Sequence, residues 1–247
     1  MIPLFALLGV VVGALINQLA SDLPARRELT NPHCPYCGRD RPWWQWLALP
    51  VMLVRQDRCP HCDAPIGLRH ALTELGLATL YVYLWLEIGP SINLPIYLVY
   101  SAIFALVVIT DVERRLILNV VTYPAIVFGV IAAYVRPNMT LWSALLGGLI
   151  GFFAFYLMAL VGHVLFGSGA LGGGDVKLAA FVGLVVGFPL VIEALVLTIL
   201  IGAGFSVILL ILRLRSLDDY VPYGPFIVAG AMVTLLWGYP IARWFLS

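Results

Sequence analysis

Long apolar runs, separated by short polar segments, occupy most of the chain. The runs cover residues 2–20, 71–89, 94–113, 119–135, 140–167, 176–188, 189–212 and 225–246. A helix needs about 20 residues to cross ~30 Å of hydrocarbon, so the pattern predicts an all-α polytopic membrane protein with about eight transmembrane helices. The run 176–188 is too short to cross comfortably, and Pro189 separates it from the next run. We therefore expect a half-helix there, or local thinning of the bilayer.

Composition and charge narrow the class of partner. Hydrophobic residues make up 62% of the chain and charged residues 11%, whereas soluble domains are about 45–50% apolar. A lipid bilayer is therefore the expected surrounding. The net charge is only +1, and no basic run is longer than Arg26-Arg27 or Arg114-Arg115. This pattern excludes nucleic acid as an expected partner.

The long polar segment between residues 21 and 70 divides the chain into three parts. We expect a first transmembrane helix at residues 1–20, a loop domain at 21–70 and a membrane domain at 71–247. Because no basic residue precedes the first apolar run, we interpret that run as a retained span and not as a secretory signal. If the loop domain is cytoplasmic, alternation of eight spans puts twelve of the fourteen Lys and Arg residues on that side. That orientation obeys the positive-inside rule.

All four cysteines lie in the loop domain, as two C-x-x-C pairs. The pairs are Cys34/Cys37 and Cys59/Cys62, and 21 residues separate them. This spacing is typical of a tetrahedral structural zinc site with four thiolate ligands. Redox chemistry is the alternative, because each pair has the C-P-x-C form of a dithiol motif. A cytoplasmic location disfavours standing disulfides, and the loop lacks the strand and helix that surround a thioredoxin-like pair.

Two acidic residues lie at the ends of apolar runs. Asp111 ends the run 94–113, and Asp175 follows three glycines at the start of the run 176–188. A charge at a membrane boundary is costly unless it is paired or used, so both are functional candidates. In the expected orientation both emerge at the cytoplasmic face. Two carboxylates brought together share one proton and activate water, which predicts aspartyl protease chemistry.

Other interpretations of these residues stay open at this point. Asp175 also suits a helix N-cap, and capping does not exclude catalysis. The stretch Gly172-Gly173-Gly174-Asp175 lacks the Gly-Lys-Ser/Thr that completes a phosphate-binding loop. A transporter of cations with Asp111, Asp175 and a broken helix on its path is an alternative function. A membrane thiol oxidoreductase that uses the cysteine pairs is another.

Several motifs in order along the chain resemble those of the type IV prepilin peptidases, bacterial G-x-G-D aspartyl proteases that also N-methylate their product. Residues 172–178 fit G-x-G-D-x-K-L, and Asp111 fits the first-aspartate motif, with Leu118 in place of a usual proline. Residues 222–226 are similar to P-F-G-P-F/Y. Arg69 and Glu74 match R-Y-P-x-x-E, with His70-Ala71 in place of Tyr-Pro. Gly13, Asn17 and Leu23-Pro24 match first-span motifs, with Asp22 in place of an arginine.

The resemblance implies a multi-pass enzyme of the bacterial cytoplasmic (inner) membrane with its active site on the cytoplasmic side. Such an enzyme cleaves a short basic leader from type IV prepilin or pseudopilin precursors of pilus and secretion systems. It then transfers a methyl group from S-adenosylmethionine to the new N-terminal residue. Asp111 and Asp175 are the expected catalytic pair, supported by Gly172, Gly174 and Lys177, and Arg69 and Glu74 are candidates for binding the methyl donor. Lys177 either orients Asp175 or binds substrate, or is a surface lysine.

Overall fold

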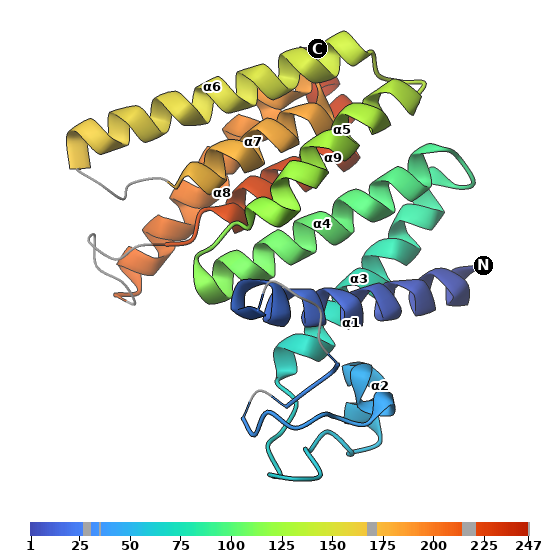
Figure 1. Ribbon diagram of the computed structural model, residues 1–247. Helices are drawn as coiled ribbons and strands as arrows, with labels where there is room; N and C mark the ends of the chain where they lie inside the picture. The colour runs from blue at the N-terminus through green and yellow to red at the C-terminus, as the bar shows by residue number, and fades with distance from the viewer. Residues whose placement is uncertain (27–30, 35, 167–171, 214–220, 247) are drawn as a thin grey trace. The chain divides into compact units, whose positions relative to one another are not determined.

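The structure, a computed structural model, describes residues 1–26, 31–34, 36–166, 172–213 and 221–246 (Figure 1). Helices are the regular elements of these residues, which contain no β-strand and only two isolated β-bridges. The elements are α1 (Ile2–Arg26), η1 (Trp43–Trp46), α2 (Ala48–Leu53), α3 (Leu68–Ile88), α4 (Asn93–Arg114), α5 (Asn119–Val135), α6 (Leu141–Phe166), α7 (Gly173–Val186), α8 (Leu190–Ile211) and α9 (Gly224–Leu246).

Each predicted apolar run overlaps one long helix, and the expected all-α fold of a multi-pass membrane protein is confirmed. Five helices within the described residues are long and apolar enough to cross a membrane: α1, α3, α4, α6 and α8. α5 and the part of α9 up to Gly238 are apolar but shorter, and α7 has 14 residues. The count of about eight spans therefore stays a prediction. α1 runs on to Arg26, six residues past the predicted end, with Pro24 inside it.

Contacts divide the chain into two compact units, Met1–Leu106 and Val107–Ser247. In the first unit, α1 packs closely along α3. A Cβ on Gly9 would lie 2.5 Å from Ala78 Cα, and one on Gly13 would lie 2.7 Å from Glu74 Cα. Only glycine allows the two backbones this approach, which is the usual basis of close helix packing in membranes.

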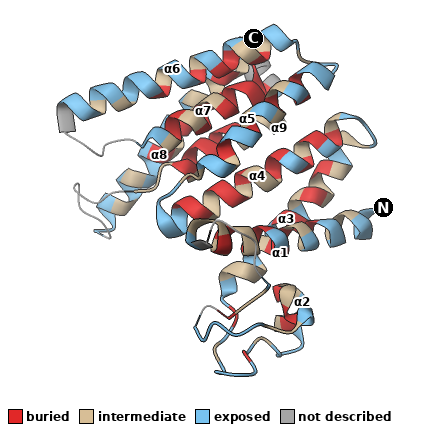
Figure 2. Cartoon of the chain, viewed as in Figure 1, coloured by how far each residue is buried: buried red, intermediate tan, exposed pale blue. Residues whose placement is uncertain are grey.

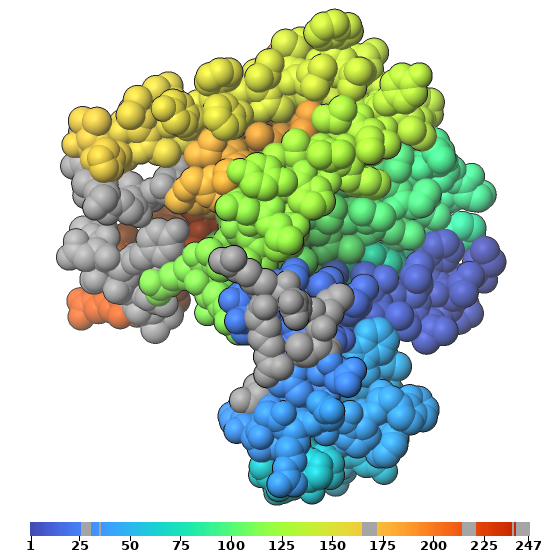
Figure 3. Space-filling model, viewed as in Figure 1, coloured from blue at the N-terminus to red at the C-terminus, as the bar shows by residue number. Residues whose placement is uncertain are grey.

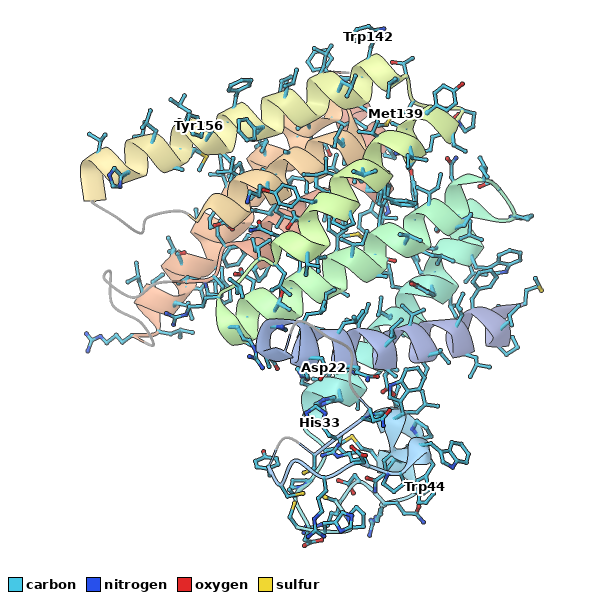
Figure 4. All side chains as sticks on the ribbon, in the orientation of Figure 1. Asp22, His33, Trp44, Met139, Trp142 and Tyr156 are labelled. Atoms are coloured by element: carbon cyan, nitrogen blue, oxygen red, sulfur yellow. The ribbon has the colours of Figure 1, made fainter. Side chains whose placement is uncertain are left out.

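In the second unit, α7 is the most enclosed helix. Ten of its 14 residues are buried, whereas α6 has an exposed face (Figure 2). α6 and α7 touch through glycines, because a Cβ on Gly147 or Gly183 would collide with the other helix backbone. The predicted packing role of these small residues is confirmed. Trp142 and Tyr156 are exposed on α6 and project away from α7, as lipid-facing aromatic side chains would (Figure 4).

The C-terminal end of α7 is held by polar side chains from α5 and α6. Arg136 is buried and donates from Nη1 to the carbonyl of Val185, with an N–O distance of 2.7 Å. Ser143 donates from Oγ to the carbonyl of Phe188 at 2.7 Å. The last carbonyls of a helix lack partners within it, and a cation there complements the helix dipole. These contacts fix one end of a helix whose other end carries Asp175.

Candidate active site

Asp111 lies in the last turn of α4, where its carboxylate meets the start of α9. It is buried, and its Oδ2 accepts a hydrogen bond of 2.8 Å from the backbone N–H of Gly224. A Cβ on Gly224 would lie only 2.7 Å from Asp111 Oδ2, so a side chain at this position would displace the carboxylate. The N-terminus of α9 thus orients the Asp111 carboxylate.

Asp175 lies in the first turn of α7 and caps its own helix. Its Oδ2 accepts a hydrogen bond of 3.1 Å from the N–H of Gly172, as the acidic residue of a capping box does. The N-cap is Gly172 and Asp175 is the third residue of the helix, so the predicted N-cap position is wrong although the carboxylate does cap the helix start. In both aspartates Oδ2 takes the backbone hydrogen bond, which leaves Oδ1 for water or substrate.

The two carboxylates lie close enough to repel each other. Burial raises the pKa of Asp175 to about 6, the Gly172 hydrogen bond lowers it in part, and the nearby charge of Asp111 raises it further. Burial also raises the pKa of Tyr223, the residue before Gly224, and the charge of Asp175 adds to this. Asp111, Asp175 and Tyr223 therefore share one buried site, in which a single ionised carboxylate costs less than two.

The other predicted residues of the G-x-G-D stretch have separate surroundings. A Cβ on Gly174 would lie 2.8 Å from Ile117 Cβ, so this glycine allows close packing against the segment between α4 and α5. Gly172 is exposed and donates to Asp175. Lys177 donates from Nζ to Asn119 Oδ1 at 2.7 Å, and its Nζ lies 4.9 Å from the centre of the Tyr123 ring. Lys177 thus joins α7 to α5 and makes no described contact with Asp175.

The four cysteines converge from two loops of the same geometry. In the first loop, the Cys34 N–H donates to Arg39 O and the Gly38 N–H donates to Cys34 O. In the second loop, the Cys59 N–H donates to Ala64 O and the Asp63 N–H donates to Cys59 O. Gly38 and Asp63 take the same left-handed conformation, with φ of 71° and 57°. Each loop therefore has the backbone form of a knuckle, a turn that can present two sulfurs to one ion.

The sulfur geometry fits a tetrahedral zinc ion. Cys34 Sγ lies 3.6 Å from Cys62 Sγ, Cys37 Sγ lies 3.9 Å from Cys59 Sγ, and all four sulfurs lie within 4.8 Å of one another. Zn–S bonds of about 2.3 Å in a tetrahedron place the sulfurs roughly 3.8 Å apart. Burial raises the pKa of the Cys34 thiol, but hydrogen bonds from the backbone of Cys37 and Tyr36 and from the side chains of Cys62 and Arg41 together lower it to about 6. The thiolate that zinc needs is thereby favoured.

The two residues expected to bind the methyl donor have other partners. Glu74 is fully buried, and its two carboxylate oxygens accept from the N–H groups of Ala48 and Leu49, each at 2.7 Å. It therefore caps α2 and ties the loop to α3. Arg69 contacts Ser21 Oγ at 3.5 Å and His70 Nε2 at 3.0 Å.

Comparison with known proteins decides the family. The model of the type IV leader peptidase family matches residues 98–207, and that of the bacterial peptidase A24 N-terminal domain matches residues 7–88. The chain belongs to the type IV prepilin peptidase family. Curated prepilin leader peptidase/N-methyltransferases are similar over nearly its whole length. That of Pseudomonas aeruginosa is 27% identical over 98% of this chain and 92% of its own. That of Bacillus subtilis is 25% identical over 100% and 98%. No solved structure matches.

Family membership gives the site residues a context that the motifs alone did not supply. The P-F-G-P-F/Y motif, matched by residues 222–226, contains the glycine that binds Asp111, a role that sequence reasoning missed. The sequence signal for this role was Gly224 itself, between Tyr223 and Pro225, because glycine is favoured where the backbone must approach another group closely. Tyr223 replaces the phenylalanine of this prepilin peptidase motif and so adds a hydroxyl group beside Asp175.

Replacing Gly224 by alanine should lower kcat/KM for leader cleavage at least tenfold, because the methyl group would displace the Asp111 carboxylate. Gly204→Ala is the matched control, since a Cβ at Gly204 meets nothing within 4 Å. A quantitative peptide cleavage assay on both variants checks this. Equal activities would show that the Asp111–Gly224 contact is dispensable.

Proposed function

We propose that this chain cleaves the leader peptide from type IV prepilin-like precursors and N-methylates the new N-terminal residue. The family match and the names of the curated relatives, prepilin leader peptidase/N-methyltransferase, support both activities. The observation that carries the cleavage step is the buried pair Asp111 and Asp175, each held through Oδ2 by a helix-terminal N–H group. The transporter and thiol oxidoreductase alternatives find no support among the relatives.

The proposed reaction uses the pair with one shared proton. The ionised carboxylate takes a proton from water as the oxygen attacks the scissile carbonyl carbon, while the protonated carboxyl donates to the carbonyl oxygen. The tetrahedral diol then collapses: the C–N bond breaks, and the new amine takes the proton from the carboxyl that had accepted it. The other carboxylate takes back a proton from a diol hydroxyl as the new carboxylic acid forms. Both aspartates end the cycle in the state in which they began. Gly172 gives substrate backbone room to approach.

The substrate class follows from the membrane setting. A precursor with an apolar N-terminal helix lies in the bilayer beside the apolar helices of the enzyme, with its leader junction at the membrane surface. We assign that surface to the cytoplasmic side of a bacterial inner membrane, because this orientation keeps twelve of fourteen Lys and Arg residues inside. Pilin and pseudopilin precursors are the partners that fit.

The two cofactors have different roles. The four cysteines suit a structural zinc ion, which would stabilise residues 34–62 and supplies no step of hydrolysis. S-adenosylmethionine would supply the methyl group to the amine that cleavage releases.

The direct test incubates the purified full-length protein in detergent with a synthetic prepilin peptide and S-adenosylmethionine, followed by mass spectrometry of the product. We expect cleavage at the leader junction and a mass increase of one methyl group on the new N-terminus. An intact peptide under conditions in which the protein stays folded would refute the proposal.

The cleavage rate should have a bell-shaped dependence on pH. The acid limb marks protonation of the base, and the alkaline limb marks loss of the shared proton, which burial and the Asp111 charge hold to a pKa of about 6 at Asp175. A profile of kcat/KM between pH 4 and 9 measures both limbs. A rate that kept rising through pH 9 would contradict a proton shared by the pair.

A further inference from the structure

A pocket beside the first knuckle has the right chemistry for a ligand that the cleavage reaction does not use. It has a volume of about 560 Å³, within the usual range of small-molecule sites. Its lining comes from α1 through Gln18, from the two arms of the knuckle through Pro32, Asp40 and Arg41, and from η1 through Trp43 and Trp46. All of these residues lie in the first unit, mostly in the lobe of residues 31–66 (blue to cyan in Figure 3).

The two indole rings of the pocket are differently held. Trp43 is 83% exposed and packs against Trp44 in a T-shaped arrangement with 6.0 Å between ring centroids, so at least one face of its ring is open to a planar ligand. Trp46 donates from Nε1 to Gln18 Oε1 at 2.9 Å, which fixes its ring against α1. A fixed ring beside an exposed one suits a purine, because every nucleobase has a flat face that can stack on an indole ring. The same rings attract a sulfonium or ammonium group by cation–π interaction.

Arg41 supplies an unsatisfied buried donor. Its side chain hydrogen-bonds the Cys34 thiol, but its Nε is buried and has no hydrogen-bond partner in the described structure. Buried donors nearly always have a partner, so this atom points to an acceptor supplied by a ligand. A ligand carboxylate is the group that a guanidinium binds best. Asp40, the neighbouring residue on the same arm, offers an anion for a ligand ammonium group.

We propose that this pocket binds the methyl donor, S-adenosylmethionine, through stacking on Trp43 and Trp46 and through ionic contacts with Arg41 and Asp40. The donor combines a purine, a sulfonium, a carboxylate and an ammonium group, and the pocket offers a complementary group to each. The proposal rests on the methyl transfer proposed above. It replaces Arg69 and Glu74 as the donor site, since Glu74 uses both carboxylate oxygens to cap α2.

The proposed zinc site would also stabilise one side of the pocket. Arg41 N–H donates to Pro32 O at 2.7 Å, and a β-bridge pairs His33 with Asp40, so the first knuckle forms the wall that carries Asp40 and Arg41. Cys34 lies between these arms, and its N–H donates to Arg39 O. An ion bound by the cysteines would hold Asp40 and Arg41 in place without contacting S-adenosylmethionine.

The test measures donor binding itself, by isothermal titration calorimetry of the full-length protein in detergent with S-adenosylhomocysteine, the product that cannot turn over. Trp43→Ala and Arg41→Gln should each weaken binding at least tenfold relative to wild type. The matched controls are Trp142→Ala, an exposed tryptophan of α6 outside the pocket, and Arg58→Gln, an exposed arginine paired with Asp63 on the second knuckle. Both controls should bind within twofold of wild type.

Zinc content and melting temperature, measured on the same samples, separate lost binding from lost folding. Wild-type affinity in both pocket variants would overturn the site while leaving the proposed methyl transfer intact. Equal weakening by Trp142→Ala and Trp43→Ala would also overturn it, because the effect would then not be specific to the pocket. A wild-type protein that cleaves prepilin but neither binds the product nor transfers methyl would refute methyl transfer and the site together.

Discussion

Asp111→Asn and Asp175→Asn should each reduce leader cleavage by about 10²- to 10⁴-fold, the usual contribution of a general acid or base. An amide cannot accept the proton from water or return it to the leaving amine, although it keeps the size of the carboxyl group. Methylation of a peptide supplied already cleaved should survive both changes, because the proposed donor pocket contains neither aspartate. Mass spectrometry of the two substrates with each variant measures both activities.

Loss of folding can be distinguished from loss of chemistry in these variants. Asp175→Asn should melt at a temperature close to that of wild type, because the amide keeps the size of the carboxyl group and its oxygen can still accept the hydrogen bond from Gly172. The melting temperature of each variant, measured beside its activity, checks this. Full cleavage by either asparagine variant would eliminate the aspartyl mechanism.

Cys37→Ser and Cys62→Ser should remove bound zinc, from about one ion per chain to near zero, and reduce methyl transfer at least tenfold. Cleavage should fall less, by no more than about threefold, because the aspartate pair needs no metal. Zinc is measured by mass spectrometry of the purified protein, and both activities by peptide assay.

His61→Ala is the matched control for the cysteine variants. His61 stands next to Cys62 and contacts Arg39 Nη1 at 3.2 Å, but the described metal-compatible cluster consists of the four cysteines alone. This variant should keep its zinc. If a cysteine variant stayed folded and lost both activities equally, the division of labour between the loop and the aspartates would be wrong.

The sequence was enough to predict the helices and to single out the aspartates, because both depend on local patterns. Apolar runs of about 20 residues define their own boundaries, and a carboxylate that ends such a run is conspicuous. The spacing of two C-x-x-C pairs likewise predicts a metal site. These predictions thus depend on residues whose pattern lies within a few positions along the chain.

Roles set by long-range contacts could not be predicted in this way. The donor to Asp111 is Gly224, 113 residues away, and no local pattern connects the two. The motif around Glu74 led us to expect that it binds the methyl donor. Glu74 instead caps α2, a six-residue helix within the polar segment that the sequence pattern did not predict. Trp43 and Trp46 carried no signal at all, because the loop must fold before their rings and Arg41 line one pocket.

The length of α7 sets the depth at which Asp175 can work. Fourteen residues at about 1.5 Å each span roughly 21 Å, some 9 Å less than the ~30 Å hydrocarbon core. Arg136 and Ser143 hold the far end of this helix, so it cannot slide to reach the opposite surface. In the orientation proposed above, and unless the bilayer thins around the enzyme, we expect the scissile bond to enter below the level of the lipid headgroups. A precursor whose cleavage point stands too far from its apolar helix would then be rejected by position alone, whatever its sequence.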